Sequence, residues 1–454
     1  MRRRLTARQA IAAVTDDFTE SDTPAGVEIP ADGPLSWSGY ADSRARATAR
    51  TGEEESVVHG LGTVGGRPCV LISFEFGFLG GSLGQRTGDL LEAAYGTAFT
   101  RRLPLVSIVA TGGSRMQEGM IALTQLQRVA RASARLRVAG LPQLAIVRDP
   151  TTGGGWATLG AGADVILALP GAQIGFAGSR VRPVDADPAA YAAEGQLAAG
   201  QIDAVVHADE LPRTLGRWLA ALGAARVDES GVPAPVPGAL AATGLPATGW
   251  DAVQQARSSA RPRAGAYLDA YFEHLLPLSG DRCGGTDPGL LCGFGVRGGR
   301  PIAYVAQCGT ATRPAGYRTA ARVIRLANRL GVPVLTLIDT PGAANDAEAE
   351  RAGAGAAIAD AFAAIAEARV PVTTLVIGEG GSGGALALAA PENTYVTPDS
   401  YFSVIAPELA AAILKRSPDA VRATADQLRL RPQDLVELGV ARGIAAPEAT
   451  AAGG

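Results

Sequence analysis

Two stretches of this chain are repeated at a constant offset of 229 residues. The run 103–113, LPLVSIVATGG, corresponds to the run 332–342, VPVLTLIDTPG (332 − 103 = 229), and the run 141–155 corresponds to 370–384 (370 − 141 = 229). In each run, an apolar and strand-like segment leads to a glycine-containing turn. Such turns leave backbone amides free to bind an anion. The repeat therefore predicts two related domains, each with its own anion-stabilising pocket.

The composition limits the class of protein. With 454 residues, of which 47% are apolar, the chain is long enough for two or three domains with full cores. Charged residues make up 19% and the net charge is −3, which argues against nucleic acid or an anionic membrane as a partner. The chain has no run of about 18 apolar residues, and its first residues do not resemble a signal peptide. We therefore expect a cytoplasmic protein.

The chain also lacks the residues that several common reactions need. His59, His207 and His274 lie outside the glycine-rich runs, which argues against a histidine-centred catalytic triad. Lys415 is the only lysine, so a G-x-x-x-x-G-K-[ST] phosphate loop is excluded. Once these reactions are set aside, the chemistry that remains is stabilisation of an enolate-like anion by backbone amides. We expect no metal, because no C-x-x-C pair occurs among Cys69, Cys283, Cys292 and Cys308.

Both halves repeat the same order of secondary structure. A β-hairpin with a Gly-Gly turn is expected over 57–76 and again over 290–306, at an offset of 233 (298 − 65). Helices and buried strands then alternate, which implies parallel strands joined by right-handed crossovers. The expected ranges are 87–99, 103–110, 142–147 and 165–168 in the first half, and 317–330, 332–339, 371–377 and 394–396 in the second.

Three glycine-rich turns are candidate sites. The run 111–119 follows a strand and opens a helix, so its amides would face an anion, and Arg115 would add a phosphate or carboxylate contact. The runs 149–156 and 378–385 place adjacent glycines between a strand and a small-residue helix, where two N–H groups can form an oxyanion hole. Each turn alone is equally explained by close packing of a helix on a sheet. The matched register of the copies favours a duplicated site.

Long motifs in both halves resemble the carboxyltransferase of bacterial acetyl-CoA carboxylase. The first half resembles its β subunit at Phe74–Ser82, Gly112–Glu118, Asp149–Gly154 and Gly175–Val181. The second half resembles its α subunit at Gly280–Arg282, Gly316–Arg318, Ile338–Gly342, Gly378–Ala385 and Ser403–Ile405. The resemblance covers roughly residues 35–445, so the chain looks like a β–α fusion.

The resemblance implies an α/β fold of two tandem crotonase-like (ClpP/crotonase) β-β-α superhelical domains related by internal duplication. It divides the chain into an N-terminal extension (1–34), a β-subunit-like domain for acyl-CoA (35–225) and an α-subunit-like domain for biotin (263–454). The segment 226–262 between them is rich in Pro, Gly, Ala and Ser, and is predicted to be a linker.

The same resemblance implies a ligand for each turn. Amides around residues 153–155 would hold the thioester oxygen of an acyl-CoA as an enolate forms, and amides around residues 383–385 would hold the ureido oxygen of biotin. The implied catalytic residues are Gly153, Gly154, Gly155, Gly383, Gly384 and Ala385. The candidate substrate-binding residues are Gly112, Gly113, Arg115, Phe176, Ala177, Arg180, Gly342 and Tyr317.

The implied reaction moves a carboxyl group from carboxybiotin to the α-carbon of a short acyl-CoA such as acetyl-CoA. Biotin supplies the base, in keeping with the absence of histidine from the turns. The chain has no Met-Lys-Met biotinylation site and no apparent ATP-binding carboxylase domain. The implied partners are therefore a separate biotin carboxyl carrier protein and a biotin carboxylase. The family also implies a homodimer or larger homo-oligomer, in which the two pockets meet across two chains.

Two other functions stay open. After Ile338–Gly342 the chain reads AANDAEAERAG over 343–353, where the family usually has an aromatic residue, Pro-Gly and an acidic-Arg-Gly group. This departure favours a decarboxylase of a malonyl-type thioester on the same fold. A non-catalytic assembly subunit is the third alternative, and the glycines kept in both halves argue against it.

Overall fold

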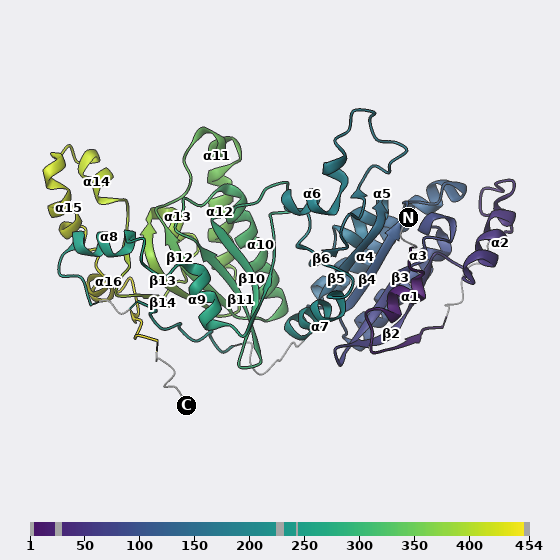
Figure 1. Ribbon diagram of the computed structural model, residues 1–454, viewed down its shortest axis with the longest axis horizontal. Coiled ribbons are helices and arrows are strands. Elements are labelled where there is room, and N and C mark those ends of the chain that lie inside the picture. Colours follow the sequence, from purple (N-terminus) through teal and green to yellow (C-terminus); the bar gives the residue numbers. More distant parts are fainter. Residues whose placement is uncertain (1–3, 23–29, 224–230, 242–243, 449–454) are drawn as a thin grey trace. The chain divides into compact units, whose positions relative to one another are not determined.

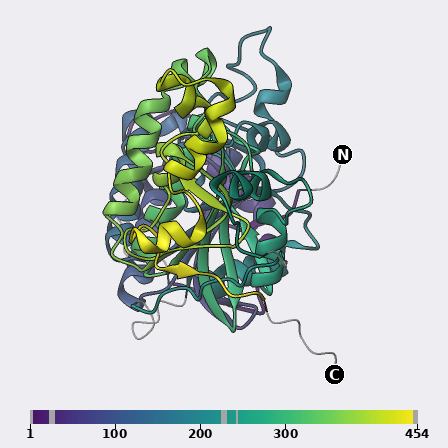
Figure 2. The same cartoon turned by 90° about the vertical axis from the view of Figure 1, so that its left-hand side faces the viewer.

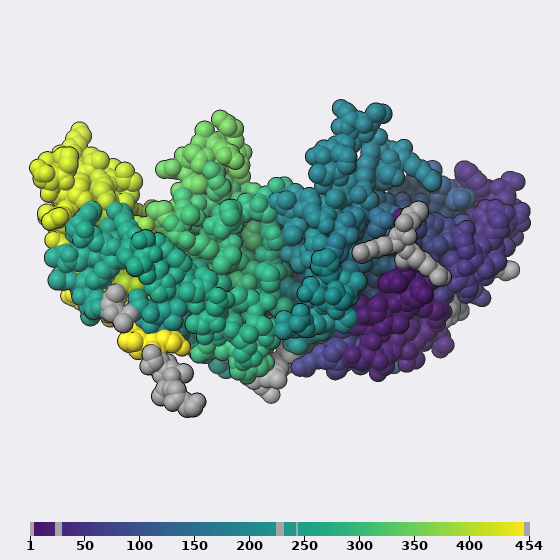
Figure 3. Space-filling view, viewed as in Figure 1, coloured from purple at the N-terminus to yellow at the C-terminus, as the bar shows by residue number. Residues whose placement is uncertain are grey.

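The computed structural model describes residues 4–22, 30–223, 231–241 and 244–448, and the structural statements below concern these residues. The chain divides into two compact units, Met1–Ala224 and Ala225–Gly454. The first unit is coloured from purple to blue-green and the second from blue-green to yellow, as a ribbon in Figure 1 and as a surface in Figure 3. Each unit is described by itself.

The first unit is built on a sheet in the order β1-β2-β3-β4-β5-β6-β8, with β7 beside the end of β5. Strands β1 to β3 are antiparallel, and the strands from β3 to β8 are parallel. Its elements are α1 (Ala7–Ala12), β1 (Asp17–Glu20), α2 (Tyr40–Thr51), β2 (Val57–Val64), β3 (Arg67–Phe74), α3 (Gln85–Arg101), β4 (Leu105–Thr111), α4 (Gly119–Val138), β5 (Gln143–Thr152), α5 (Gly153–Gly155), β6 (Val165–Ala168), β7 (Ile174–Gly175), α6 (Ala193–Ala198), β8 (Ala204–Val205) and α7 (Leu211–Leu222).

The second unit repeats this sheet in the order β9-β10-β11-β12-β13-β14-β16, with β15 beside the end of β13. The prediction of two related α/β domains is therefore confirmed. Its elements are α8 (Gly249–Arg257), α9 (Ala264–Tyr271), β9 (His274–Pro277), β10 (Leu290–Arg297), β11 (Arg300–Gln307), α10 (Pro314–Leu330), β12 (Val334–Thr340), α11 (Ala347–Arg351), α12 (Ala354–Ala366), β13 (Val372–Gly381), α13 (Ser382–Leu386), β14 (Thr394–Val396), β15 (Tyr401–Ser403), α14 (Pro407–Ile413), α15 (Val421–Gln427), α16 (Pro432–Glu437) and β16 (Gly443–Ile444).

Each sheet contains the predicted hairpin with its two-glycine turn. Gly65 and Gly66 have φ of +55° and +71°, and Gly298 and Gly299 have φ of +57° and +72°. Positive φ at both central residues defines a type I′ turn, whose twist matches that of the flanking strands, and glycine adopts it without steric cost. The local sequence therefore determines the register of each hairpin.

Strands β5 and β13 extend beyond the predicted ranges 142–147 and 371–377, to Thr152 and Gly381. The pairing between β4 and β5 shifts register and then resumes, and the same happens between β12 and β13. The short strands β7 and β15 pair with these last residues. As a result, both glycine turns begin at the sheet itself.

The segment 226–262, predicted to be a linker, is counted with the second unit. Its residues 226–230 and 242–243 lie outside the described residues. Within it, α8 is capped at its start by Thr248, whose hydroxyl accepts the N–H of Asp251 at 3.1 Å. The apolar face of α8 is buried with side chains of the C-terminal region, in a cluster of Ala252, Val253, Ala256, Tyr401, Ala425 and Leu430.

Helices cover both faces of the second sheet (Figures 1 and 2). Helix α9 packs on one face, where Tyr267 and Leu268 join a buried cluster with Tyr304, Leu335 and Leu375. Helices α10 and α12 lie on the opposite face, on the left of the sheet in Figure 2. The two faces of the second sheet are therefore covered, and its glycine turn lies at the strand ends.

Candidate active site

The two glycine turns of the first unit meet at the carboxyl ends of neighbouring strands. Gly112 and Gly113 follow β4, and Gly153 follows β5. The backbone of Gly153 is left-handed, with φ of +64°, and a Cβ atom there would lie 3.1 Å from the Cα atom of Gly113. Glycine at both positions therefore lets the turns approach this closely.

Two amides of these turns are used by the protein itself. The N–H of Gly113 donates to Thr111 Oγ1 at 3.0 Å, and the N–H of Gly153 donates to the carbonyl of Phe176 at 3.1 Å. The next amides, of Gly154 and Gly155, lie in the first turn of a helix, where N–H groups have no acceptor within the helix. Neither donates to any other group in the described part of the chain. These amides are available to a ligand oxygen.

The second unit reproduces the bonds of Gly113. The N–H of Gly342 donates to Thr340 Oγ1 at 3.1 Å, as its counterpart Gly113 does to a threonine. The carbonyl of Gly342 accepts the N–H of Thr312 at 3.1 Å, and the carbonyl of Gly113 accepts that of Leu83 at 2.9 Å. The 229-residue offset therefore holds for individual hydrogen bonds.

The structure aligns the two turns one residue away from the predicted catalytic sets. The offset pairs Gly153 with Ser382, and residues 154–156 with 383–385. Ser382 is left-handed, with φ of +59°, as Gly153 is with +64°. Ser382 lies outside the predicted set, which contains glycines and the adjoining Ala385. Applying the offset to Gly153 would have identified it.

Tyr317, a predicted substrate-binding residue, lies behind the second turn. Its side chain is 1% exposed, and its hydroxyl donates to the carbonyl of Gly384 at 3.0 Å. Burial raises the pKa of Tyr317 well above its ordinary range, so the phenol remains a donor at neutral pH. Tyr317 therefore acts on the turn rather than facing a ligand.

Replacing Tyr317 with Phe removes this bond and the phenol's side-chain contact with Thr312, and it leaves the Gly384 carbonyl without its phenol donor. The Tyr317→Phe protein is expected to lose about 0.5–1.5 kcal/mol in free energy of unfolding, measured in urea. Tyr395→Phe serves as the control, because that half-buried hydroxyl has no hydrogen-bond partner within the described ranges. Equal stability of Tyr317→Phe and the wild type would contradict the importance of this bond.

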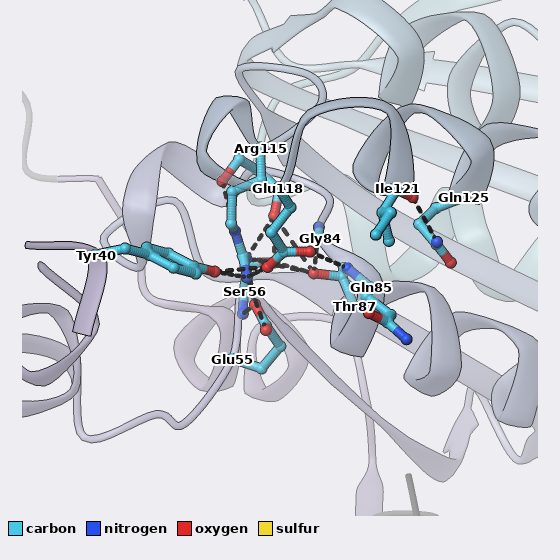
Figure 4. Close-up of polar contacts among 11 residues, drawn as sticks. Tyr40, Glu55, Ser56, Gly84, Gln85, Thr87, Arg115, Glu118, Ile121 and Gln125 are labelled. Atoms are coloured by element: carbon cyan, nitrogen blue, oxygen red, sulfur yellow. Dashed lines mark hydrogen bonds and ion pairs between the residues drawn. The ribbon is translucent and has the colours of Figure 1, made fainter. Parts of the chain in front are cut away.

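Arg115, predicted to contact a substrate phosphate or carboxylate, lies inside the first unit with 1% exposure. Its guanidinium donates to both carboxylate oxygens of Glu55 and to Glu118 at 3.3 Å (Figure 4). The same Nη1 that donates to Glu55 and Glu118 also reaches the Tyr40 hydroxyl at 3.1 Å, and Nε donates to Ser82 Oγ at 3.2 Å. Since the guanidinium is saturated by the protein, the predicted contact with a substrate is replaced by a positioning role.

Charge keeps this buried network ionised. Burial alone would lower the pKa of Arg115, but the charge of Glu55, the hydrogen bond to Glu55 and the charges of Tyr40 and Glu118 together outweigh burial, and the pKa is raised. Burial alone would raise the pKa of Glu55, and Arg115 reverses that effect, so the pKa is lowered. The backbone N–H of Arg115 donates to Leu83, whose own N–H donates to Gly113. The network therefore anchors the first turn.

Phe176, Ala177 and Arg180 lie on the loop after β7. The bond from Gly153 to the Phe176 carbonyl places this loop at the first turn, and the Phe176 side chain is 75% exposed. Ala177 follows directly and is half-buried, whereas Arg180 is exposed farther along the loop. The structure thus brings Phe176 and Ala177 to the turn, and shows no contact of Arg180 with it.

The described residues contain neither a helix suited to crossing a membrane nor a cluster of metal-binding side chains. None of their helices is long and apolar enough to cross a membrane. No three His, Cys, Asp or Glu side chains among them gather as metal ligands would.

Comparison with known families matches both units. Residues 33–206 match the family described as carboxyl transferase domain, and residues 245–453 match the family described as acetyl co-enzyme A carboxylase carboxyltransferase-like. The repeated sheet with its paired glycine turns therefore defines two carboxyltransferase domains in one chain.

Similar proteins of known name show which kind of carboxyltransferase this chain resembles. The acetyl-coenzyme A carboxylase carboxyl transferase subunits beta/alpha of Saccharopolyspora erythraea is 40% identical, covering 90% of this chain and 76% of the relative. The protein of the same name from Salinispora arenicola is 38% identical, with 91% and 77% covered. The probable biotin-dependent acyl-coenzyme A carboxylase beta3 subunit of Mycobacterium bovis is 34% identical, with 88% and 82% covered. The chain belongs to the acetyl-CoA carboxylase carboxyl transferase beta/alpha family, and it is a carboxyltransferase.

Two solved structures share the fold. Transcarboxylase 12S, determined with methylmalonyl-coenzyme A and methylmalonic acid, has a TM-score of 0.78 at 22% identity, covering 97% of this chain and 86% of that one. A single-chain, multi-domain long-chain acyl-CoA carboxylase has a TM-score of 0.75 at 21% identity, covering 98% of this chain and 45% of that one. The predicted crotonase-like fold class is confirmed.

Proposed function

We propose that this carboxyltransferase moves a carboxyl group from carboxybiotin, carried on a separate protein, to the α-carbon of a short acyl-CoA such as acetyl-CoA. The product would be malonyl-CoA. The duplicated turn supports this reaction. The backbone N–H groups of Gly154 in the first unit and Gly383 in the second occupy corresponding positions at the 229-residue offset. Two oxygens gain negative charge during such a transfer, and each turn offers N–H groups to one of them.

In this proposal the first turn binds the thioester oxygen. Removal of the α-proton moves an electron pair onto that oxygen, and the amides of residues 154–155 stabilise the enolate. The second turn, at residues 383–384, binds the ureido oxygen of the biotin substrate. The bond between the ring nitrogen and the carboxyl carbon breaks, carbon dioxide is released, and the charge left on the ureido group is stabilised by these amides. The ring nitrogen takes the α-proton, and the enolate carbon bonds to carbon dioxide.

The reverse reaction tests the proposal. Purified wild-type protein is expected to carboxylate free biotin at the expense of malonyl-CoA, with acetyl-CoA as the second product. Both products can be followed by chromatography. Absence of carboxyl transfer from malonyl-CoA to biotin, in a folded protein, would overturn the proposed function.

The acyl half is tested by Gly154→Ala. A Cβ atom at Gly154 would lie 2.5 Å from both Cδ atoms of Leu126, so either the Leu126 side chain or the helix start must shift, and we expect the free amides to be displaced. Losing an oxyanion donor typically costs about 10²–10³ in rate, and we expect that loss in carboxyl transfer. Gly96→Ala is the matched control, because a Cβ atom there meets open space. Full activity of a folded Gly154→Ala protein would contradict the assignment.

Decarboxylation of a malonyl-type thioester is the second candidate function, and it rests on the departure of the segment 343–353 from the sequence that the family usually has there. The segment contains α11, whose start is capped by Asp346 accepting the N–H groups of Glu348 and Ala349 at 3.0 Å each. This segment lies on the surface of the second unit, in green at the top of Figure 3. Release of carbon dioxide from malonyl-CoA without any biotin would favour this function. The free amides in both turns argue against a non-catalytic assembly subunit.

We also propose a biotin carboxyl carrier protein and a biotin carboxylase as partners, and a homo-oligomer in the cytoplasm. The Mycobacterium bovis relative is named as biotin-dependent, and transcarboxylase 12S is a hexamer, which supports both points. Light scattering of the purified chain is expected to give at least twice the 46.1 kDa of one chain. A monomer at micromolar concentration would contradict the oligomer.

A further inference from the structure

A cavity of about 330 Å³ opens in the first unit among residues that the proposed reaction does not use. Its wall is formed by α1, the end of β1, α2, β2 and α3. Ligand pockets begin at roughly this size, about 300 Å³. The charged and titratable side chains that line the cavity include Arg8, Glu20, Arg44, Glu53, His59 and Arg86.

Two side chains in this wall carry buried nitrogen atoms without partners. His59 is 3% exposed, and neither Nδ1 nor Nε2 has a hydrogen-bond partner among the described residues. The same holds for Nη1 of Arg86, whose nearest acid is Asp89 at 3.7 Å. Asp89 in turn accepts from Arg128 at 2.8 Å. Buried polar groups nearly always have a partner, so these three atoms indicate one that comes from outside the chain.

Together with Arg115, the formal charges of the wall balance, but not every charged group has a hydrogen-bond partner. Arg8 pairs with Glu20 and with Glu53 at 2.7 Å each. Glu55, also in the wall, pairs with Arg115 of the buried network. Arg44 and Arg86 then face the cavity with the exposed Glu54. The argument for an anionic ligand oxygen therefore rests on the Arg86 guanidinium, whose Nη1 has no hydrogen-bond partner among the described residues.

The second unit provides an internal comparison. A cavity of about 340 Å³ lies at the equivalent place, between β9, β10 and α10. There Cys292 stands in place of His59, at the hairpin offset of 233, and Ala315 stands in place of Arg86, at the offset of 229. The wall of this second cavity is mainly apolar. The fold therefore forms the cavity in both units. Because the second cavity lacks a histidine and an arginine at these positions, the His59 and Arg86 side chains are not needed to form the cavity.

The chemistry of the two side chains defines what they can bind. Burial lowers the pKa of His59, so its imidazole is neutral at pH 7 and offers one N–H donor and one nitrogen acceptor. Arg86 offers a further charged donor. A complementary ligand needs an anionic oxygen for these donors and a hydroxyl or amino group for the imidazole nitrogen. The cavity volume is equivalent to about ten water molecules at about 30 Å³ each, which suits a small metabolite.

We propose that this cavity binds a small carboxylate that also carries a hydroxyl or amino group, held by Arg86 and His59. Its wall includes Glu55, the bidentate partner of Arg115, and Arg115 anchors the Gly112–Gly113 turn. Occupancy of the cavity is therefore expected to change the KM for acyl-CoA. The binding itself does not depend on the proposed function, whereas this kinetic effect does.

Calorimetric titration of the full chain tests the site with four probes. These are L-malate, succinate, L-aspartate and inorganic phosphate. Malate and succinate differ by one hydroxyl, and a hydrogen bond of about 1.4 kcal/mol corresponds to tenfold in affinity. We expect malate or aspartate to bind at least tenfold more tightly than succinate. Arg86→Gln and His59→Leu should each weaken that binding at least tenfold, and Arg101→Gln, an exposed change on the same helix, should not.

Three results would overturn the site. The first is that none of the four probes binds, which would mean that water fills the cavity. The second is binding that survives both Arg86→Gln and His59→Leu. The third is phosphate binding as tightly as malate, which would exclude the carboxylate class. Binding of malate or aspartate without any change in the KM for acyl-CoA would leave the site itself standing and would overturn only its proposed link to the Gly112–Gly113 turn.

Discussion

A Gly383→Val protein is expected to fold as the wild type does and to transfer carboxyl groups about 10²–10³-fold more slowly. Gly383 is exposed, and a Cβ atom added to it meets no heavy atom within 4 Å, so the valine causes no clash inside the protein. Its methyl groups would instead occupy the open space beside the free amides, where the ureido oxygen is proposed to bind. The first turn is untouched, so binding of acyl-CoA should be retained.

The experiment separates the two turns within one protein. Thermal unfolding reports the fold, calorimetry with acetyl-CoA reports the first turn, and carboxyl transfer from malonyl-CoA to biotin reports both. Gly265→Val is the matched control, because Gly265 is also the second residue of a helix and a Cβ atom there meets open space. Wild-type transfer by a folded Gly383→Val protein would remove this turn from the reaction.

Arg115→Met is expected to lower the free energy of unfolding by about 3–5 kcal/mol. Methionine preserves much of the side-chain volume but leaves Glu55 and Glu118 buried without a cation. The double variant Arg115→Met/Glu55→Gln should recover part of the loss, because it removes the stranded charge as well. Urea unfolding measures both. For comparison, Arg128→Met breaks ion pairs of an arginine side chain that is 34% exposed and should cost at most about 1 kcal/mol.

Acidification should reduce the difference between wild type and Arg115→Met. The pKa of Glu55 is lowered in the folded wild type, so its stabilising contribution is present above the unfolded value of about 4.3 and is lost as pH falls through the folded value. The gap in free energy of unfolding should therefore be largest near neutral pH and shrink below about pH 4. A gap that is constant with pH would show that packing, and not charge, accounts for the loss.

The predictions that depended on short-range pattern agree closely with the structure. The Gly-Gly pairs at 65–66 and 298–299 form the expected hairpin turns, because the required φ angles are set by those residues themselves. The continuous apolar runs form parallel strands, because the strands of a parallel sheet are buried on both faces and need apolar side chains on each of them. The extra length of β5 and β13 was not predictable, since it depends on a register shift and on pairing with β7 and β15.

The candidate site was predicted in outline and corrected in detail. The glycine turns lie at the strand ends, as the repeat suggests. Arg115 looks in sequence like a surface arginine beside a helix start, and only packing against Glu55, Glu118 and Tyr40 buries it. Tyr317 was chosen from a motif, and the structure shows that it contacts the back of the turn.

By itself, the sequence determined the duplication, the order of the strands and the position of both glycine turns. These features follow from local backbone preferences and from periodic apolar residues, which are readable along the chain. The tertiary structure alone decided which amides stay free and that His59 and Arg86 line one cavity. Those properties arise from contacts between residues distant in sequence, and no short-range pattern encodes them.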